Sequence, residues 1–319
     1  MKKIKTTSLI LAVSLFFTGC MTDPDTTYRE EGSEATTVII VTEADPFDSL
    51  GEDIEVTILD DRIVEESCIN GVDYTLTVDL SKWDGKTTRE QLAECSRVFW
   101  YCYPRMYERF GVYADSPTDV ILAVENEGYE IAEAWDNHVH IHDMWLSDNP
   151  GDYDCLTHEF AHVIQNGWDG DRLEYDSYIE RFADYCRYIY AYDQGYYNDE
   201  IWDLQTVATE SDRESSVRFL VWMDYAYSMG IKEEDLMLRF FRVCHDGSYE
   251  ADDWDRAWEE IFKGTRAEGM TVDQVWQEYI ESDFAYLDSH AERGQLSDLL
   301  SSYGIRDKIR GANEADYFE

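Results

Sequence analysis

The sequence predicts an α+β fold with a small N-terminal sheet, a helix that carries the candidate site, and a C-terminal helical lobe. Up to about residue 150, short apolar or alternating runs typical of strands predominate. Beyond about residue 150, the apolar spacing is helical almost to the end of the chain. The composition is 44% hydrophobic and 14% aromatic, which is enough apolar material to fill the core of one large domain or two smaller ones.

The first 19 residues predict a bacterial lipoprotein signal peptide. A short basic region, residues 1–5, precedes a mostly apolar stretch, residues 6–17, which is shorter than the roughly 20 residues of a spanning helix. Residues 17–20 read Phe-Thr-Gly-Cys and resemble a lipobox, with Phe in place of the commoner Leu. We therefore expect a lipid on Cys20 as the only membrane anchor, and a location at the cell envelope, on the bacterial outer membrane or the cell surface. An ordinary signal peptide is the alternative.

Four regions follow the predicted signal peptide. They are an acidic tether (20–36), a short β-rich segment (37–70), the main domain (71–290) and a C-terminal tail (291–319). The tether is too poor in apolar residues to pack against a core. Strands are expected where apolar residues alternate or run together. These stretches are residues 37–42, 54–59, 73–80, 119–124 and 138–145.

One long helix is expected between the third and fourth of these strands, at residues 88–110. Apolar and aromatic residues recur there at helical spacing. Thr88, followed three residues later by Gln91, makes a capping box at its start. Gly111 is expected to end it.

Charge and cysteine content narrow the class of protein. The chain has 69 acidic and 26 basic residues, a formal net charge of −43, which disfavours nucleic-acid binding. We expect a monomer. Six cysteines remain besides Cys20, an even number that allows up to three disulfides in an exported chain, although buried free thiols fit equally well.

The chemistry is concentrated at residues 157–165, which read T-H-E-F-A-H-V-I-Q and contain an H-E-x-x-H motif. On a helix, His158 and His162 lie one turn apart and project from the same face, so both imidazoles can bind one metal ion. Glu159 follows the first of them and would reach a metal-bound water as a general base rather than the metal itself. A chance occurrence of the motif is the alternative, but histidine is scarce, with 7 in 319 residues.

A second acidic pair follows on the next expected helix. Glu180 and Asp184 are again one turn apart. Glu180 supplies a carboxylate for a third ligand position, and Asp184 could accept a hydrogen bond from a ligating histidine and fix its tautomer. Two histidines and one carboxylate, with a fourth position left for water, are the catalytic pattern for Zn²⁺. The alternative is a pair of solvated helix charges.

The sequence resembles the basic secretory proteins, which are plant and bacterial peptidases and zincins of the gluzincin type. The resemblance rests on the His-Glu helix that ends in Gln, residues 156–165, and on residues 179–187, which match a family helix reading roughly I-E-G-x-A-D-Y-x-R. Looser matches extend the resemblance over about residues 72–285. They lie at residues 130–134, 138–141, 217–220 and 271–279.

The resemblance implies a zincin-like fold, in which the active-site helix lies beneath a small mixed sheet and a helical lobe follows. It also implies zinc-dependent hydrolysis of peptide bonds in extracellular proteins or glycoproteins. The substrate would lie along the edge strand, expected at residues 138–145 or just before them. Two departures are Arg181, where the family has Gly, and Arg213, where a Tyr is expected, so Arg213 becomes a candidate substrate or oxyanion contact.

Other histidines are weaker candidates. His138, His140 and His142 alternate along an expected strand and share one of its faces. They could form a second metal site, but a solvent-facing or cleft-lining stripe without metal is favoured, with His140 as a possible substrate or oxyanion contact. His245 could donate to an oxyanion, although a surface loop position is favoured.

A second class of function stays open at this point. A surface lipoprotein could use the same scaffold only to bind a host protein or glycopeptide. The presence of Glu159 favours the enzyme, because a pure binding protein needs no general base.

Overall fold

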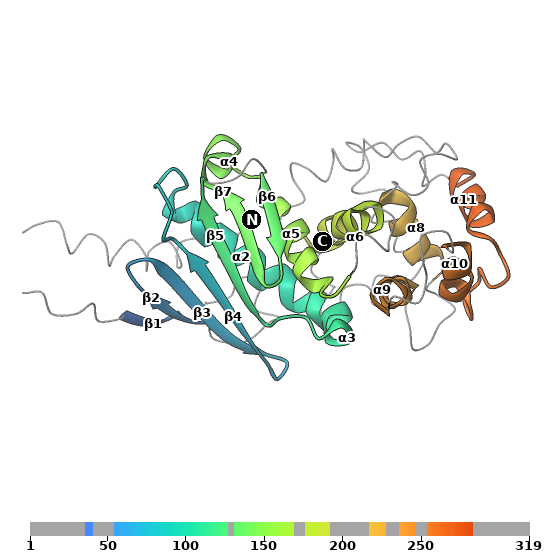
Figure 1. Ribbon diagram of the computed structural model, residues 1–319, viewed down its shortest axis with the longest axis horizontal. Coiled ribbons are helices and arrows are strands. Elements are labelled where there is room, and N and C mark those ends of the chain that lie inside the picture. Colours follow the sequence, from blue (N-terminus) through green and yellow to red (C-terminus); the bar gives the residue numbers. More distant parts are fainter. Residues whose placement is uncertain are drawn as a thin grey trace, which may run out of the picture.

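The computed structural model describes residues 36–40, 54–126, 131–168, 176–191, 217–227, 236–246 and 254–282 (Figure 1). The predicted signal peptide, Cys20, Arg213 and the tail at 291–319 lie outside the described residues, as does the predicted tether apart from its last residue. The described part has an α+β fold, which confirms the predicted fold class. No helix in these ranges is both long enough and apolar enough to cross a membrane.

A seven-stranded mixed sheet forms the N-terminal half, with the strand order β1-β2-β3-β4-β5-β7-β6. The strands are β1 (Thr36–Ile40), β2 (Ile54–Ile58), β3 (Arg62–Ile69), β4 (Val72–Asp79), β5 (Asp119–Glu125), β6 (Ala132–Trp135) and β7 (His138–His142). The first four strands form an antiparallel meander. Strand β5 runs parallel to both β4 and β7, and β6 is antiparallel to β7. The segment predicted at 37–70 therefore shares one sheet with the domain predicted at 71–290.

The hairpin between β3 and β4 is fixed by Asn70 and Gly71. Both have positive φ angles, 53° and 80°, as a type I′ turn requires. This Asn-Gly pair indicates a hairpin, yet β3 was not among the expected strands because its apolar alternation is interrupted by Glu65 and Glu66.

The strand predicted at residues 138–145 is too long. It ends at His142, and the short helix α4 (Asp143–Asp148) begins at the next residue. The Asp143 carboxylate accepts hydrogen bonds from the backbone N–H groups of Lys86 and Thr87, which ties this part of the chain to the loop before α2. The edge strand is β6, in the segment just before residues 138–145.

The long helix begins as predicted but does not end at Gly111. Helix α2 (Arg89–Met106) has the expected capping box of Thr88 and Gln91. It continues through the π-helix η3 (Tyr107–Gly111) into α3 (Val112–Ala114), which ends at Asp115 with a φ of 51°. A Cβ atom on Gly111 would lie 2.7 Å from Tyr107 and 3.1 Å from Ile164. Gly111 therefore allows the helix to pack closely against Ile164, and it does not end the helix.

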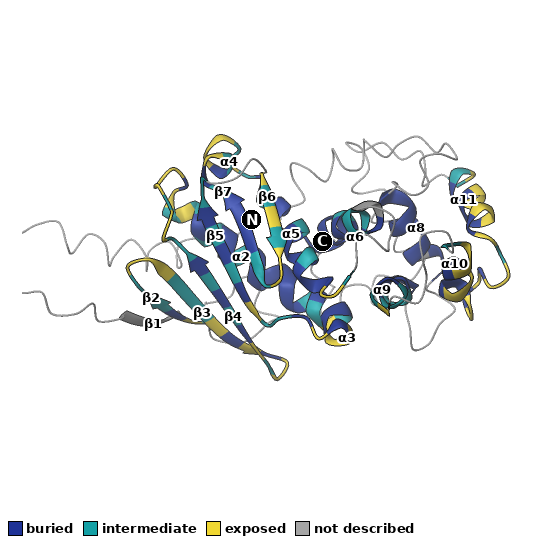
Figure 2. Ribbon diagram, viewed as in Figure 1, coloured by how far each residue is buried: buried dark blue, intermediate teal, exposed yellow. Residues whose placement is uncertain are grey.

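One face of the sheet is covered by α2 and by α5 (Asp154–Ile164), which also contact each other (Figure 1). Buried side chains are concentrated in the central strands and in the helix surfaces that face them (Figure 2). The Phe99 ring, on α2, packs against that of Phe160, on α5, at a centroid distance of 5.3 Å. Buried apolar side chains thus hold α5 against α2 and the sheet.

The described residues of the C-terminal part are mainly helical, as predicted. Its helices are α6 (Asp176–Tyr190), α8 (Val217–Tyr227), α9 (Leu236–Asp246), α10 (Trp254–Phe262) and α11 (Val272–Ile280). Helix α6 contacts both α5 and α8, so it links the sheet half to the helical half. Tyr178, at the start of α6, packs on Trp254, at the start of α10, at a centroid distance of 4.1 Å.

Candidate metal centre

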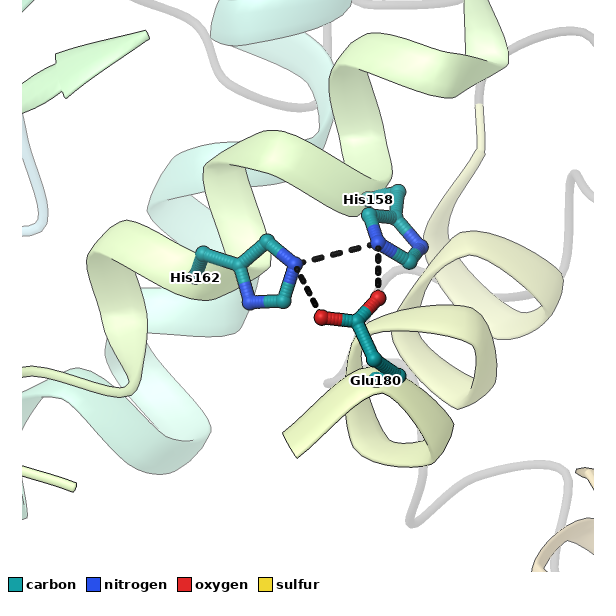
Figure 3. Close-up of side chains that lie close together, drawn as sticks. All are labelled: His158, His162 and Glu180. Carbon is teal, nitrogen blue, oxygen red and sulfur yellow. Dashed lines mark hydrogen bonds and ion pairs between the residues drawn. The ribbon is translucent and has the colours of Figure 1, made fainter. Parts of the chain in front are cut away.

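Helix α5 presents the two histidines of the motif from one face. Its apolar residues Leu156, Phe160 and Ile164 are fully buried against the core. His158 and His162 are partly exposed on another face, toward α6 (Figure 3). The amphipathic pattern of the helix therefore determines where both imidazoles point.

The structure brings together the three residues predicted as ligands. His158 Nε2 and His162 Nε2 are 3.0 Å apart. The two carboxylate oxygens of Glu180, from α6, lie 3.1 Å from His158 Nε2 and 3.6 Å from His162 Nε2. One donor atom from each residue lies within 4.8 Å of the others (Figure 3). Among the described residues, no other group of three or more His, Cys, Asp or Glu side chains meets this condition.

The other nitrogen of each ring fixes its tautomer. His158 Nδ1 lies 2.8 Å from Asp184 Oδ1, which can only accept a hydrogen bond while ionised. His162 Nδ1 lies 2.7 Å from Gln165 Oε1. The Gln165 amide is oriented in turn, because its Nε2 donates to the Ile179 carbonyl at 2.8 Å. Both Nδ1 atoms therefore donate, and in the neutral rings both Nε2 atoms carry lone pairs.

This arrangement fits a bound divalent cation. Two nitrogen lone pairs at 3.0 Å, together with a carboxylate, repel one another unless a positive charge lies among them. The donor set of two imidazoles and one carboxylate is one that zinc prefers. The contact predicted between Asp184 and a ligating histidine is present, and such a contact orients an imidazole for metal binding.

In the absence of a metal cation, a proton on one of the histidines would have to supply the positive charge. Burial opposes charge on His158, but hydrogen bonds to Asp184 and Glu180 outweigh it and raise the pKa of His158 to about 10. Burial and the neighbouring His158 charge lower the pKa of His162 to about 4. Despite its burial, the hydrogen bond to His158 keeps the pKa of Asp184 below its usual range. The site is therefore organised around a single positive charge.

Glu159 lies on α5 beside the two histidines and differs from the other acids of the site. Its side chain is buried, and no described residue forms a hydrogen bond with it. Burial raises the pKa of Glu159 to about 7, opposed by His158 and Arg187 and assisted by Glu180 and Glu133. A carboxylate with a near-neutral pKa can both take and return a proton at physiological pH.

Two supporting residues were not predicted as site residues. Gln165, just after α5, holds His162 as described above. Arg187, on α6, donates to Asp154 in the first turn of α5 at 2.9 Å, and contacts Asp152, two residues before that helix, at 3.4 Å. The available signals were the Gln that ends the first motif and the Arg that ends the second.

Arg181, on α6, also contacts the site. It forms an ion pair with Asp184 Oδ2 at 2.9 Å, while the other oxygen of Asp184 accepts from His158. Arg181 thus places a positive charge next to the carboxylate that supports His158.

His140 and His245, two other histidines singled out in the sequence and described in the structure, are not part of this group of potential ligands. His140 is buried on β7, with Nδ1 3.6 Å from Glu133 and Nε2 3.8 Å from Glu125. His245 lies in the last turn of α9 and not in a surface loop, and its ring packs against Tyr113 at a centroid distance of 5.4 Å, near Gly167. The six cysteines that the structure describes are free thiols, and all but Cys68 are buried.

Comparison of the chain with protein-family models, with curated proteins and with solved structures finds no match.

Proposed function

We propose that this protein is a zinc-dependent endopeptidase with a zincin-like arrangement of sheet and active-site helix, acting on extracellular proteins or glycoproteins. The observation that carries the proposal is the convergence of His158, His162 and Glu180 on one point, with Glu159 beside them. Two imidazoles and one carboxylate leave a coordination position open, as catalytic zinc sites do.

Each residue has a distinct role in the proposed reaction. Bound zinc would polarise the scissile carbonyl and lower the pKa of a water toward neutrality. Glu159 would accept a proton from the attacking water and return it to the leaving amine, which its pKa of about 7 favours. Asp184 and Gln165 would hold the two imidazoles in place.

Strand β6 supports the choice of a peptide substrate. It is the last strand in the sheet order and packs against α5 (Figure 1). An unpaired strand edge binds an extended peptide through backbone hydrogen bonds. A peptide added there would run beside the helix that carries Glu159.

Export with a lipid on Cys20 remains part of the proposal. The sequence of residues 1–20 supports it, and a cell-surface enzyme would meet extracellular proteins directly.

The deciding experiment compares the purified protein with its Glu159→Gln and His162→Ala variants. We expect the wild type to hold one equivalent of zinc and to cleave casein or mucin glycopeptides in a zinc-dependent manner. Glu159→Gln should keep zinc and the melting temperature but lose about 10²–10⁴-fold in turnover, because only the base is removed. His162→Ala should lose the zinc as well.

Full turnover by the Glu159→Gln protein would rule out this mechanism. A wild type that holds zinc, binds glycopeptides and cleaves none of them would instead support a binding lipoprotein.

A further inference from the structure

The outer edge of β6 offers a defined set of backbone groups. His142 N–H donates to the Ile131 carbonyl at 3.0 Å, which continues the β6–β7 ladder by one pair. Hydrogen-bonded and non-hydrogen-bonded pairs alternate along an antiparallel ladder, so Glu133 is bonded to β7, whereas Ala132 and Ala134 are not. The N–H and C=O groups of these two alanines therefore point outward, and no described strand pairs with them.

The side chains of β6 divide between two faces. Ala132 and Ala134 pack against the core on the helix side of the sheet. Glu133 and Trp135 project from the opposite face. There the Glu133 side chain is 50% exposed and Trp135 is 46% exposed.

Both exposed side chains lie against side chains of the neighbouring strand β7. The Trp135 ring stacks on His138, with a centroid distance of 5.7 Å and an interplanar angle of 4°. The Glu133 carboxylate lies 3.6 Å from Nδ1 of the buried His140. A negative charge and a flat apolar surface are thus presented two residues apart, at the spacing of alternate side chains of an extended peptide.

The strand that carries this pair packs against the helix that carries the proposed catalytic base. Helix α5 carries Glu159, and β6 is the last strand in the sheet order. A peptide that extends the sheet at β6 would therefore place its residues near the reacting bond and, at the same time, opposite Glu133 and Trp135.

We infer that Glu133 and Trp135 determine substrate specificity, with Glu133 selecting a lysine or arginine and Trp135 selecting a large apolar residue two positions away. The inference rests on the proposed peptidase function. A peptide antiparallel to β6 would bond to Ala132 and Ala134, so its residue opposite Glu133 would occupy a non-hydrogen-bonded pair, where side chains are closest. Opposite charges across such a pair attract, and like charges repel. The net charge of −43 would attract basic substrates in general. Glu133 would restrict the preference for Lys or Arg to the one substrate residue that lies opposite it.

The test is cleavage of a mixed peptide library, with cleavage sites read by mass spectrometry, for the wild type and four variants. Glu133→Gln and Glu133→Lys change the charge at the edge, and Trp135→Ala removes the apolar surface. Glu66→Lys is the matched control, because Glu66 is an exposed glutamate on the distant strand β3 of the same sheet. Preferences are taken as ratios within each digest, so that changes in total activity cancel.

We expect the wild type to favour Lys or Arg over Gln about fivefold at one position, and a large apolar residue two positions away. Glu133→Gln should remove the basic preference, and Glu133→Lys should replace it with a preference for Asp or Glu. Trp135→Ala should remove only the apolar preference. The Glu66→Lys profile should match the wild type.

Cleavage by Glu133→Lys with an unchanged basic preference would overturn the inference and leave the peptidase proposal intact. Absence of cleavage by the zinc-loaded wild type would instead refute the peptidase proposal and, with it, the inference.

Discussion

Arg187 Nε donates to Asp154 Oδ2 at 2.9 Å, and this buried ion pair joins α6 to the first turn of α5. Asp154 lies one turn before His158, and Arg187 lies three residues after Asp184, so the pair stands next to the Asp184–His158 hydrogen bond. Glu180 and its two histidines form the next contact along the same helices. Polar contacts therefore hold the two helices in register over the whole candidate site.

Removing Arg187 should destabilise the fold. In Arg187→Met, the Asp154 carboxylate would stay buried without its partner, which typically costs about 3–5 kcal/mol in the free energy of unfolding. Chemical denaturation measures this loss. The double variant Arg187→Met/Asp154→Leu should recover part of it, because no unpaired charge remains at that position.

Arg62→Met, which removes an exposed pair with Asp61, should change stability by less than about 1 kcal/mol. Equal losses in Arg187→Met and Arg62→Met would contradict the buried-pair interpretation.

Asp152 should make stability depend on pH. Burial raises the pKa of Asp152 to about 7 in the folded protein, whereas an unfolded Asp titrates near 3.9. A carboxyl group with a raised pKa stabilises the fold fully below its unfolded pKa, and this contribution is lost as pH rises through about 7. Between pH values of about 4 and 7, Asp152 should lower stability by roughly 1.4 kcal/mol per pH unit.

Asp152→Asn cannot ionise, yet its side-chain oxygen can still accept from Trp145. Its stability should therefore fall less steeply with pH than that of the wild type in the same window. Urea denaturation of zinc-free protein across this range is the measurement. Parallel pH profiles for the two proteins would show that Asp152 does not titrate as argued.

Helical periodicity made the two histidines and the Glu180–Asp184 pair predictable, because each pair is one turn apart on its own helix. The supporting residues were harder to predict. Gln165 lies just beyond α5, three residues after His162, so helical spacing allows the two side chains to meet. The sequence does not show that the Gln165 amide also donates to the Ile179 carbonyl on α6, which orients it toward His162.

The sequence predicted the approximate position of the edge strand, at residues 138–145 or just before them, but not its bounds. Strand β6 has four residues, Ala-Glu-Ala-Trp, whose alanines are small and whose larger side chains face outward. Such a strand carries almost no hydrophobic alternation, so its identity depends on pairing with β7. The specificity role inferred for Glu133 could not be derived before that pairing was known.

Cys20 should carry a lipid in the exported protein. The apolar stretch that ends in Thr-Gly-Cys is the basis for this prediction. Mass spectrometry of the mature N-terminus should find a diacylglyceryl mass on Cys20, and Cys20→Ser should move the protein from the membrane fraction to the soluble fraction. An unmodified N-terminus at a neighbouring residue would show ordinary signal cleavage instead.

Gln165 should determine how tightly zinc is held. In Gln165→Leu, the buried Nδ1–H of His162 loses its acceptor, and the ring is free to turn away from the ligand orientation. Loss of such a supporting contact typically lowers metal affinity about 10–100-fold. Gln165→Glu keeps the acceptor while giving up the donation to Ile179, so it should retain more of the affinity than Gln165→Leu. Competition with a chromophoric chelator measures each affinity, and Gln277→Leu on the exposed surface of α11 is the control. Wild-type zinc affinity in Gln165→Leu would mean that the orientation of His162 is set by α5 alone.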